Sequence, residues 1–111
     1  MSELKVCEVK SSGFRVCVER GGEDVGHAFL YLMNNDIHKR PFGFVEDVFV
    51  DESYRGDGLG KELMNKIVDL ARENNCYKMI FTSRFVKERL HSYYEKQGFT
   101  KHGFEFRIDF D

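Results

Sequence analysis

The stretch from Phe44 to Lys61, FVEDVFVDESYRGDGLGK, constrains the fold more than any other part of this 111-residue chain. Its first part, Phe44–Val50, is rich in valine and phenylalanine, which is typical of a β-strand. Residues 51–53 end that pattern, and three alternate glycines follow at positions 56, 58 and 60. A helical pattern of leucines begins directly afterwards. The sequence therefore predicts a strand, a glycine-rich loop and a helix in direct succession.

The predicted loop has the features of an anion-binding site. Glycine adopts backbone conformations that other residues avoid and lets a ligand approach the main chain closely. The N–H groups at a helix start, with the positive end of the helix dipole behind them, favour phosphate or pyrophosphate. Two well-known phosphate loops do not match. Glu62 stands where the nucleoside-triphosphate motif needs Ser or Thr, and the glycine spacing differs from G-x-G-x-x-G.

The spacing Arg55-x-x-Gly58-x-Gly60 resembles the R/Q-x-x-G-x-G/A pyrophosphate loop of the GNAT superfamily of N-acetyltransferases, which bind acetyl-coenzyme A. The resemblance extends from about Gly43 to the C-terminus, in the order strand, loop, helix, strand, helix and strand. The segments VEDVFV at 45–50 and CYKMI at 76–80 look like glucosamine-6-phosphate N-acetyltransferases and their small bacterial relatives. The segment YYEKQGF at 93–99 is similar to the F-Y-E-K-x-G-F segment of the family.

The order of the elements, together with this resemblance, predicts an α+β fold, an α/β three-layer arrangement with two main helices. Its central sheet should be mixed and mostly antiparallel, with a central parallel strand pair. Helices are expected at about Gly58–Asn74 and Phe85–Gln97. Strands are expected at Leu4–Lys10, Phe14–Arg20, Val25–Met33, Phe44–Val50, Tyr77–Thr82, Phe99–Lys101 and Phe104–Phe110. The inner strand at Tyr77–Thr82 should be covered on both faces. Residues 1–111 should form one domain of this type.

A Ser-Ser-Gly turn at residues 11–13 is predicted to join the first two strands in a hairpin. Lys10 would then pair with Phe14, and Cys7 would lie opposite Cys17. The family usually places two helices between its first two strands, and they help to wall the acceptor pocket. We therefore expect a fold without the first two family helices, and an acceptor side that is open or is completed by loops or by another subunit. The sequence leaves open whether the chain forms a homodimer.

Composition limits the partners and the compartment. With 17 Lys and Arg against 19 Asp and Glu, the net charge is −2, which gives no support to nucleic-acid binding through a basic face. No run of 18 apolar residues predicts a membrane span, and no signal peptide is recognised. Three cysteines occur without a zinc-binding spacing. We expect a cytoplasmic protein with no nucleic-acid partner, no membrane contact and no metal.

The resemblance implies that acetyl-CoA is a co-substrate bound by main-chain groups. The loop would hold the pyrophosphate, and backbone groups of the preceding strand would bond the pantetheine arm and the acetyl carbonyl. The side chains of that strand's last two residues would belong to the core. For Arg55 and Lys61 the alternative is that they are surface cations near a helix start. The expected cofactor-binding residues are Phe49, Val50, Arg55, Gly56, Asp57, Gly58, Leu59, Gly60, Lys61 and Tyr94.

Moving an acetyl group from a thioester to an amine needs a neutral amine, a stabilised oxyanion and a proton for the departing thiolate. By the resemblance, Tyr94 would give that proton, since a tyrosine ordinarily keeps its proton to about pH 10 and a thiol only to about pH 8.5. The alternative is a packing aromatic at a helix–sheet contact. No cysteine lies in a motif beside a histidine, so a cysteine acyl-enzyme is not expected.

The candidate bases lie in the strand before the loop. A charge in the middle of an apolar strand must find a partner or a solvated cleft, so Glu46 or Asp47 is the candidate. The V-E-D match favours Glu46, and a structural salt bridge is the alternative. Strict alternation would place Glu46 and Val50 on one face of the strand, and Asp47 and Phe49 on the other.

We therefore expect an acetyl-CoA-dependent N-acetyltransferase that transfers the acetyl group directly to a primary amine in a ternary complex. The resemblance favours a small amine such as an amino sugar phosphate. Two alternatives stay open. One is the same chemistry on a protein or peptide amine, because an open acceptor side suits an extended chain. The other is a non-catalytic acyl-CoA-binding module, which would bind coenzyme A and turn over no amine.

Overall fold

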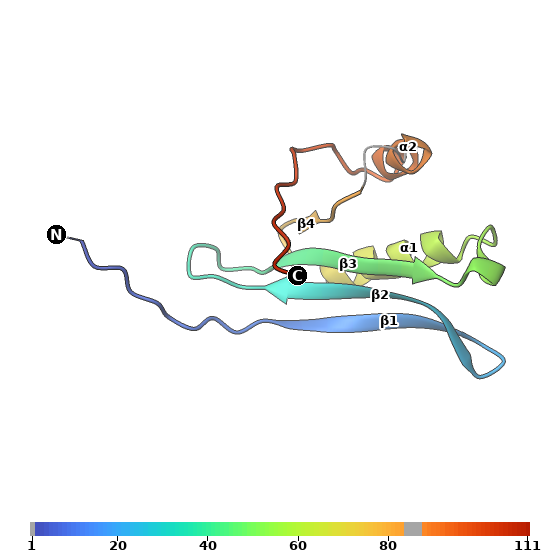
Figure 1. The fold of residues 1–111 in the computed structure, drawn as a ribbon, viewed down its shortest axis with the longest axis horizontal. Coiled ribbons are helices and arrows are strands. Elements are labelled where there is room, and N and C mark those ends of the chain that lie inside the picture. Colours follow the sequence, from blue (N-terminus) through green and yellow to red (C-terminus); the bar gives the residue numbers. More distant parts are fainter. Residues whose placement is uncertain (1, 84–87) are drawn as a thin grey trace. The chain divides into compact units, whose positions relative to one another are not determined.

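The computed structural model describes residues 2–83 and 88–111, which fall into two compact units, Met1–Phe81 and Thr82–Asp111 (Figure 1). The first unit contains a four-stranded sheet and helix α1 (Leu59–Glu73), and the second contains helix α2 (Glu88–Lys96). Each unit is described by itself, so the expectation of one domain stays a prediction. Neither helix has the length and apolarity of a membrane span in the described part of the chain.

The sheet of the first unit confirms the predicted mixed α+β architecture. Its order is β1-β2-β3-β4, with antiparallel pairing among the first three strands and parallel pairing of the last two. Two glycines with φ of 59° and 82°, Gly21 and Gly22, form the turn between β1 and β2. The strands are β1 (Ser12–Arg20), β2 (Glu23–Met33), β3 (Phe42–Val50) and β4 (Met79–Ile80).

Helix α1 packs against one face of this sheet and forms the core with it (Figure 1). Its buried side chains recur at helical spacing, and they meet alternate residues of β2 together with Val45 of β3. Asn74 ends the helix, where its side-chain amide donates to the Leu70 carbonyl at 2.8 Å. The predicted helix at Gly58–Asn74 is confirmed. The core residues are Val25, Ala28, Leu30, Leu32, Val45, Leu59, Leu63, Met64, Ile67 and Ala71.

Replacing Ile67 by valine should test this packing. The Ile67 side chain is fully buried, so the lost methyl group leaves a small cavity and should lower the free energy of unfolding by about 0.5–1.5 kcal/mol. Urea denaturation would measure it. Lys66→Gln, at the exposed neighbouring position, should stay within about 0.5 kcal/mol of the parent. Equal effects at the two positions would contradict the packing described here.

The predicted N-terminal hairpin is wrong. Gly13 lies inside β1 rather than in a turn, and Phe14 pairs with Leu30 of β2. A Cβ at Gly13 would come within 2.7 Å of the Leu30 carbonyl oxygen, so this glycine serves the close approach of two strands. Cys17 consequently lies opposite His27 and not opposite Cys7. Residues 2–11 have no assigned strand, and their apolar side chains are largely exposed.

A β-bulge in β3 overturns the expected alternation. Glu46 pairs with Phe29, and Phe49 pairs with His27. Between these two pairs β3 contains one residue more than β2, which is a β-bulge. The extra residue falls at Asp47, whose φ is +53°. Glu46 and Phe49 therefore share the sheet face opposite α1, which we call the second face. Val50, paired with Gly26, points its side chain to the α1 face.

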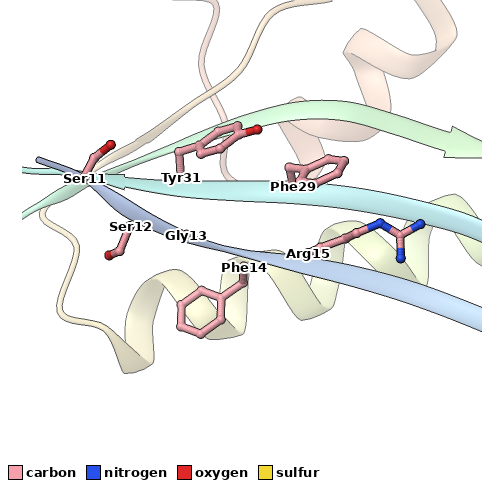
Figure 2. Close-up of a pocket in the computed structure, with 7 residues that line it drawn as sticks. All are labelled: Ser11, Ser12, Gly13, Phe14, Arg15, Phe29 and Tyr31. Carbon is pink, nitrogen blue, oxygen red and sulfur yellow. The ribbon is translucent and has the colours of Figure 1, made fainter.

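The expectation that Phe49 is a core residue is wrong for the same reason. Its side chain lies on the second face and is 41% exposed, whereas Val50 is partly buried. Figure 2 shows the second face through Phe29 and Tyr31, which point away from the side of Phe14 and α1.

Two expectations about the later strands also fail. The strand at Tyr77–Thr82 shrinks to β4, which pairs only through Gly43 with Met79 and Phe44 with Ile80, and Ile80 is 41% exposed. Residues 99–111 have no assigned strand, and the alternating apolar side chains at 104, 106, 108 and 110 are largely exposed. Alternation produces a strand only where a partner strand exists. Residues 84–87 of the expected second helix lie outside the described residues.

Candidate active site

The glycine-rich loop has the geometry that the sequence predicts. The N–H of Asp51 donates to the Val25 carbonyl at 2.8 Å, and a short 3-10 turn, Glu52–Tyr54, carries the chain from β3 to the loop. Gly56 and Gly58 have φ of 94° and 81°, in the left-handed region where glycine is favoured. Helix α1 begins directly after Gly58. The two glycines thus turn the chain from the end of β3 into the start of α1.

The space above the loop is open. A Cβ added at Gly56, Gly58 or Gly60 would meet no heavy atom within 4 Å. Gly58 is the N-cap, and it offers no side-chain oxygen to the first turn of the helix. The first backbone bond across that turn runs from the Glu62 N–H to the Gly58 carbonyl at 3.1 Å. The first N–H groups of a helix, here those of Leu59 and Gly60, precede the intrahelical hydrogen-bond ladder, and a helix start of this kind can bind anions.

Arg55 ties the loop to the end of β3. Its Nε donates to the Val50 carbonyl at 2.8 Å, and its guanidinium carbon lies 5.8 Å from the centre of the Phe49 ring. The guanidinium is therefore held over the second face by a hydrogen bond and a cation–π contact. Arg55, which the sequence suggested for phosphate binding, therefore has a structural role at the end of β3.

The edge of β3 beyond Phe44 has no strand partner on the β4 side within the described residues. The Gly43 N–H points to that side, because it donates to the Lys78 carbonyl at 2.9 Å. By the two-residue period of a strand, the backbone groups of Val45 point the same way. The Asp51 N–H points to β2, so Val50 again directs its backbone groups away from β2. The alternation instead turns the backbone groups of Phe49 toward His27 on β2.

The bulge brings a histidine to the candidate carboxylates. His27 Nε2 lies 3.1 Å from Asp47 Oδ2, and the exposed fractions of the two side chains are 22% and 65%. The imidazole stacks on the Phe49 ring at 5.5 Å and 29°, and meets the Phe29 ring edge-on at 5.7 Å. Sequence reasoning missed His27, because its only signal is the register of the bulge.

Tyr94 belongs to the second unit, in the last turn of α2. Its ring makes edge contacts with Tyr93 at 5.6 Å and with Phe99 at 6.2 Å, and its carbonyl accepts from the Phe99 N–H at 3.1 Å. Gly98, with φ of 102°, ends the helix as predicted. Partial burial, and secondarily Tyr93, raises the pKa of Tyr94. Its phenol therefore keeps its proton at neutral pH.

A shallow groove of about 390 Å³ runs along the edge of β1 (Figure 2). Arg15 within it pairs with Asp24 at 2.6 Å and lies 5.9 Å from the centre of the Phe29 ring. This hydrogen bond holds the pKa of Asp24 below its usual range. None of the residues expected in the active site lines the groove. Its lining residues are Ser11, Ser12, Gly13, Phe14, Arg15, Phe29 and Tyr31.

The chain belongs to the acetyltransferase (GNAT) family, whose model matches residues 2–99. It is 39% identical over 94 residues to a glucosamine 6-phosphate N-acetyltransferase of Trypanosoma brucei brucei, a match that covers 84% of this chain and 62% of that protein. It is 41% identical over 68 residues to a probable glucosamine 6-phosphate N-acetyltransferase 2 of Oryza sativa subsp. japonica, covering 61% and 39%.

Solved structures agree with the family. An acetyltransferase from Trypanosoma brucei superposes with a TM-score of 0.73 at 39% identity, over 84% of this chain and 64% of that one. The GNAT-like fold predicted from the sequence is thus confirmed. The chain spans less than two thirds of the length of each of these relatives.

Proposed function

We propose that this chain carries an acetyl-CoA-dependent N-acetyltransferase activity, in which the acetyl group passes directly to a primary amine in a ternary complex. The observation that carries the proposal is the helix start after two left-handed glycines, with open space above it. Members of the GNAT family are acetyltransferases that use acetyl-CoA, which supports this choice of acyl donor. A pyrophosphate is the anion that this loop would receive.

The donor would lie along the loop and the unpaired edge of β3. The main-chain N–H groups at the helix start would hold the pyrophosphate. The backbone groups of Val50 lie on the edge of β3 beyond the end of β4, where they could bond the pantetheine arm or the acetyl carbonyl. The Phe49 ring contacts both the Arg55 guanidinium and the His27 imidazole, and so helps to hold these two side chains in place beside the proposed donor site. The proposed donor-binding residues are Phe49, Val50, Arg55, Gly56, Asp57, Gly58, Leu59, Gly60, Lys61 and Tyr94.

Three proton transfers complete the proposed reaction. The amine loses a proton to Glu46, the base favoured by the sequence, or to its neighbour Asp47, directly or through water. The neutral amine attacks the thioester carbonyl carbon, the carbon–sulfur bond breaks, and Tyr94 gives its phenolic proton to the departing thiolate. The amide nitrogen then gives its remaining extra proton to the phenolate, directly or through water. The raised pKa of Tyr94 suits an acid that must stay protonated until the thiolate departs.

A small amine such as an amino sugar phosphate is the acceptor we favour. This choice of acceptor is supported by the activity for which the relatives are named: the Trypanosoma brucei brucei protein, 39% identical to this chain, is a glucosamine 6-phosphate N-acetyltransferase. This chain covers 62% of that protein, so the acceptor side is the part of the proposal that most needs a test.

A binding test with acetyl-CoA, followed by a screen of amines, tests the proposed donor and the proposed acceptor in turn. Acetyl-CoA should raise the melting temperature of the purified chain, because a ligand that binds only the folded state stabilises it. S-acetylpantetheine, which lacks the pyrophosphate, should give a much smaller shift at the same concentration. Release of free coenzyme A thiol would then be followed with glucosamine 6-phosphate, glucosamine and a peptide amine.

We expect turnover to be fastest with glucosamine 6-phosphate. A larger rate with the peptide would move the proposal to protein or peptide acceptors. A thermal shift without turnover on any amine would leave a coenzyme A-binding module. The absence of any shift at an acetyl-CoA concentration on the order of 1 mM would contradict donor binding itself.

A further inference from the structure

The bulge in β3 gives two successive carboxylates to one side of the sheet. In a regular strand Glu46 and Asp47 would point to opposite faces. Here Glu46 sits opposite Phe29, and Asp47 reaches His27 on the same second face. Asp47 adopts φ of +53°, a conformation that costs free energy for a residue with a side chain. Such outliers concentrate at functional sites, so the direction of the Asp47 carboxylate calls for a role.

We propose that His27 is a positioning residue, which holds Asp47 as the carboxylate that accepts the amine proton and makes turnover depend on the protonation of the imidazole. This inference rests on the proposed acetyltransferase function and refines it, since it distinguishes Asp47 from Glu46. His27 acts only through Asp47.

The contact between the two side chains fixes the orientation of the carboxylate. An ionised carboxylate only accepts hydrogen bonds, so a neutral His27 must carry its hydrogen on Nε2 and donate it to Oδ2. The imidazole cannot turn freely, because Phe49 stacks on it and Phe29 meets it edge-on. Asp47 keeps about two thirds of its side-chain surface exposed, so Oδ1 stays within reach of an acceptor amine.

The proton balance is simple. An ammonium proton moves to Asp47, and the freed lone pair attacks the thioester carbonyl carbon. The thiolate that leaves takes its proton from Tyr94, and the new amide nitrogen gives its extra proton to the resulting phenolate, directly or through water. Asp47 then releases its proton to solvent. Throughout this step His27 stays neutral and keeps its donor bond to Oδ2.

Protonation of His27 should oppose this role. An imidazolium 3.1 Å from a carboxylate favours the ionised carboxylate and so lowers its affinity for the amine proton. Turnover should therefore fall at a lower pH, once the imidazole is protonated. The other charged or titratable groups near this site are Arg15 and Cys17 on β1, Asp24 and Tyr31 on β2, Glu46 on β3, and Arg55 over the Phe49 ring. Asp24 interacts electrostatically with His27 and is paired with Arg15 at 2.6 Å.

Three substitutions and a control test the proposal through kcat measured against pH. His27→Gln keeps a side-chain donor but cannot gain a proton, so its kcat at pH 8 should stay within about threefold of the parent. The acidic decline of the parent should be missing in His27→Gln. His27→Ala loses the donor, and its kcat should fall about tenfold at pH 8 with an unchanged KM for acetyl-CoA. Asp47→Asn should lose at least as much.

The matched control is His38→Gln. His38 lies on the loop before β3, where it contacts the Tyr77 ring at 4.6 Å, so this variant should keep the acidic decline of the parent. An acidic decline that survives in His27→Gln would overturn the proposal. So would a parent-like kcat in Asp47→Asn, particularly if Glu46→Gln is inactive.

An NMR spectrum of the histidine ring carbons at pH 8 gives a readout that does not depend on turnover. His27→Gln identifies the resonance, and Asp47→Asn should change its chemical shift, because the substitution removes the carboxylate that lies 3.1 Å from Nε2. An unchanged chemical shift would contradict the contact. If the parent releases no coenzyme A with any amine at any pH, the proposed function has failed and this role fails with it. A parent that turns over with a decline independent of His27 defeats this inference alone.

Discussion

Tyr94→Phe should lower kcat about 100-fold and change KM for acetyl-CoA by less than about threefold. The substitution removes one oxygen from a partly buried ring whose contacts with Tyr93 and Phe99 are otherwise kept. If the phenol gives the thiolate its proton, the loss appears in the chemical step and hardly in donor binding. Steady-state release of coenzyme A at a saturating amine concentration would measure it.

The pH dependence of kcat should also show that Tyr94 acts as an acid. Burial disfavours the phenolate and raises the pKa of Tyr94 above its usual value of about 10. The acid form is therefore fully present at neutral pH and is lost only as the pH rises through that raised pKa. We expect the parent to keep its acid function through pH 9, and Tyr94→Phe to be impaired equally from pH 7 to pH 9.

Tyr93→Phe is the matched control, because it removes the same atom from the adjacent position of α2. Its kcat should stay within about threefold of the parent. Equal losses in the two variants would indicate packing of the aromatic pair and not proton transfer. A parent-like kcat in Tyr94→Phe would remove Tyr94 from the mechanism.

The features that the sequence predicted correctly are those set by neighbouring residues. The apolar stripe of Leu59, Leu63 and Ile67 defines α1, and the glycines at 56 and 58 take the left-handed conformations that their spacing implied. These patterns need no distant partner, because helical periodicity and glycine geometry are local properties. The helix start that carries the proposed function is therefore readable from the sequence.

The features that the sequence missed depend on partners far along the chain. Gly13 looked like part of a turn, but it is required by the approach of Leu30, seventeen residues away. The bulge at Asp47 exists only in the register between β2 and β3, so neither the His27 contact nor the exposed Phe49 ring could be read from either strand alone. The alternating segment at residues 104–110 indicated a strand, but alternation cannot supply a pairing partner.

Gly60→Val should weaken acetyl-CoA binding by about 10- to 100-fold without destabilising the chain. Loss of one charge-assisted hydrogen bond to the pyrophosphate costs about 1.5–3 kcal/mol, which corresponds to that change in Kd. Apart from its chain neighbours and the backbone of its own helix, no protein atom lies within 4 Å of an added Cβ at Gly60, so the new side chain should disturb the fold little. Gly58 would be a poorer probe, because its φ of 81° strains any substituted side chain. Isothermal titration calorimetry with acetyl-CoA, beside a urea melt, would separate affinity from stability.

The control for this variant is Gly103→Val, which adds the same atoms at another open position without a left-handed backbone. Its Kd for acetyl-CoA should match that of the parent. If Gly60→Val bound acetyl-CoA normally while remaining folded, the pyrophosphate could not lie over the start of α1, because two methyl groups would then occupy its place. A parent that binds acetyl-CoA with both glycine variants unaffected would require a donor site elsewhere in the chain.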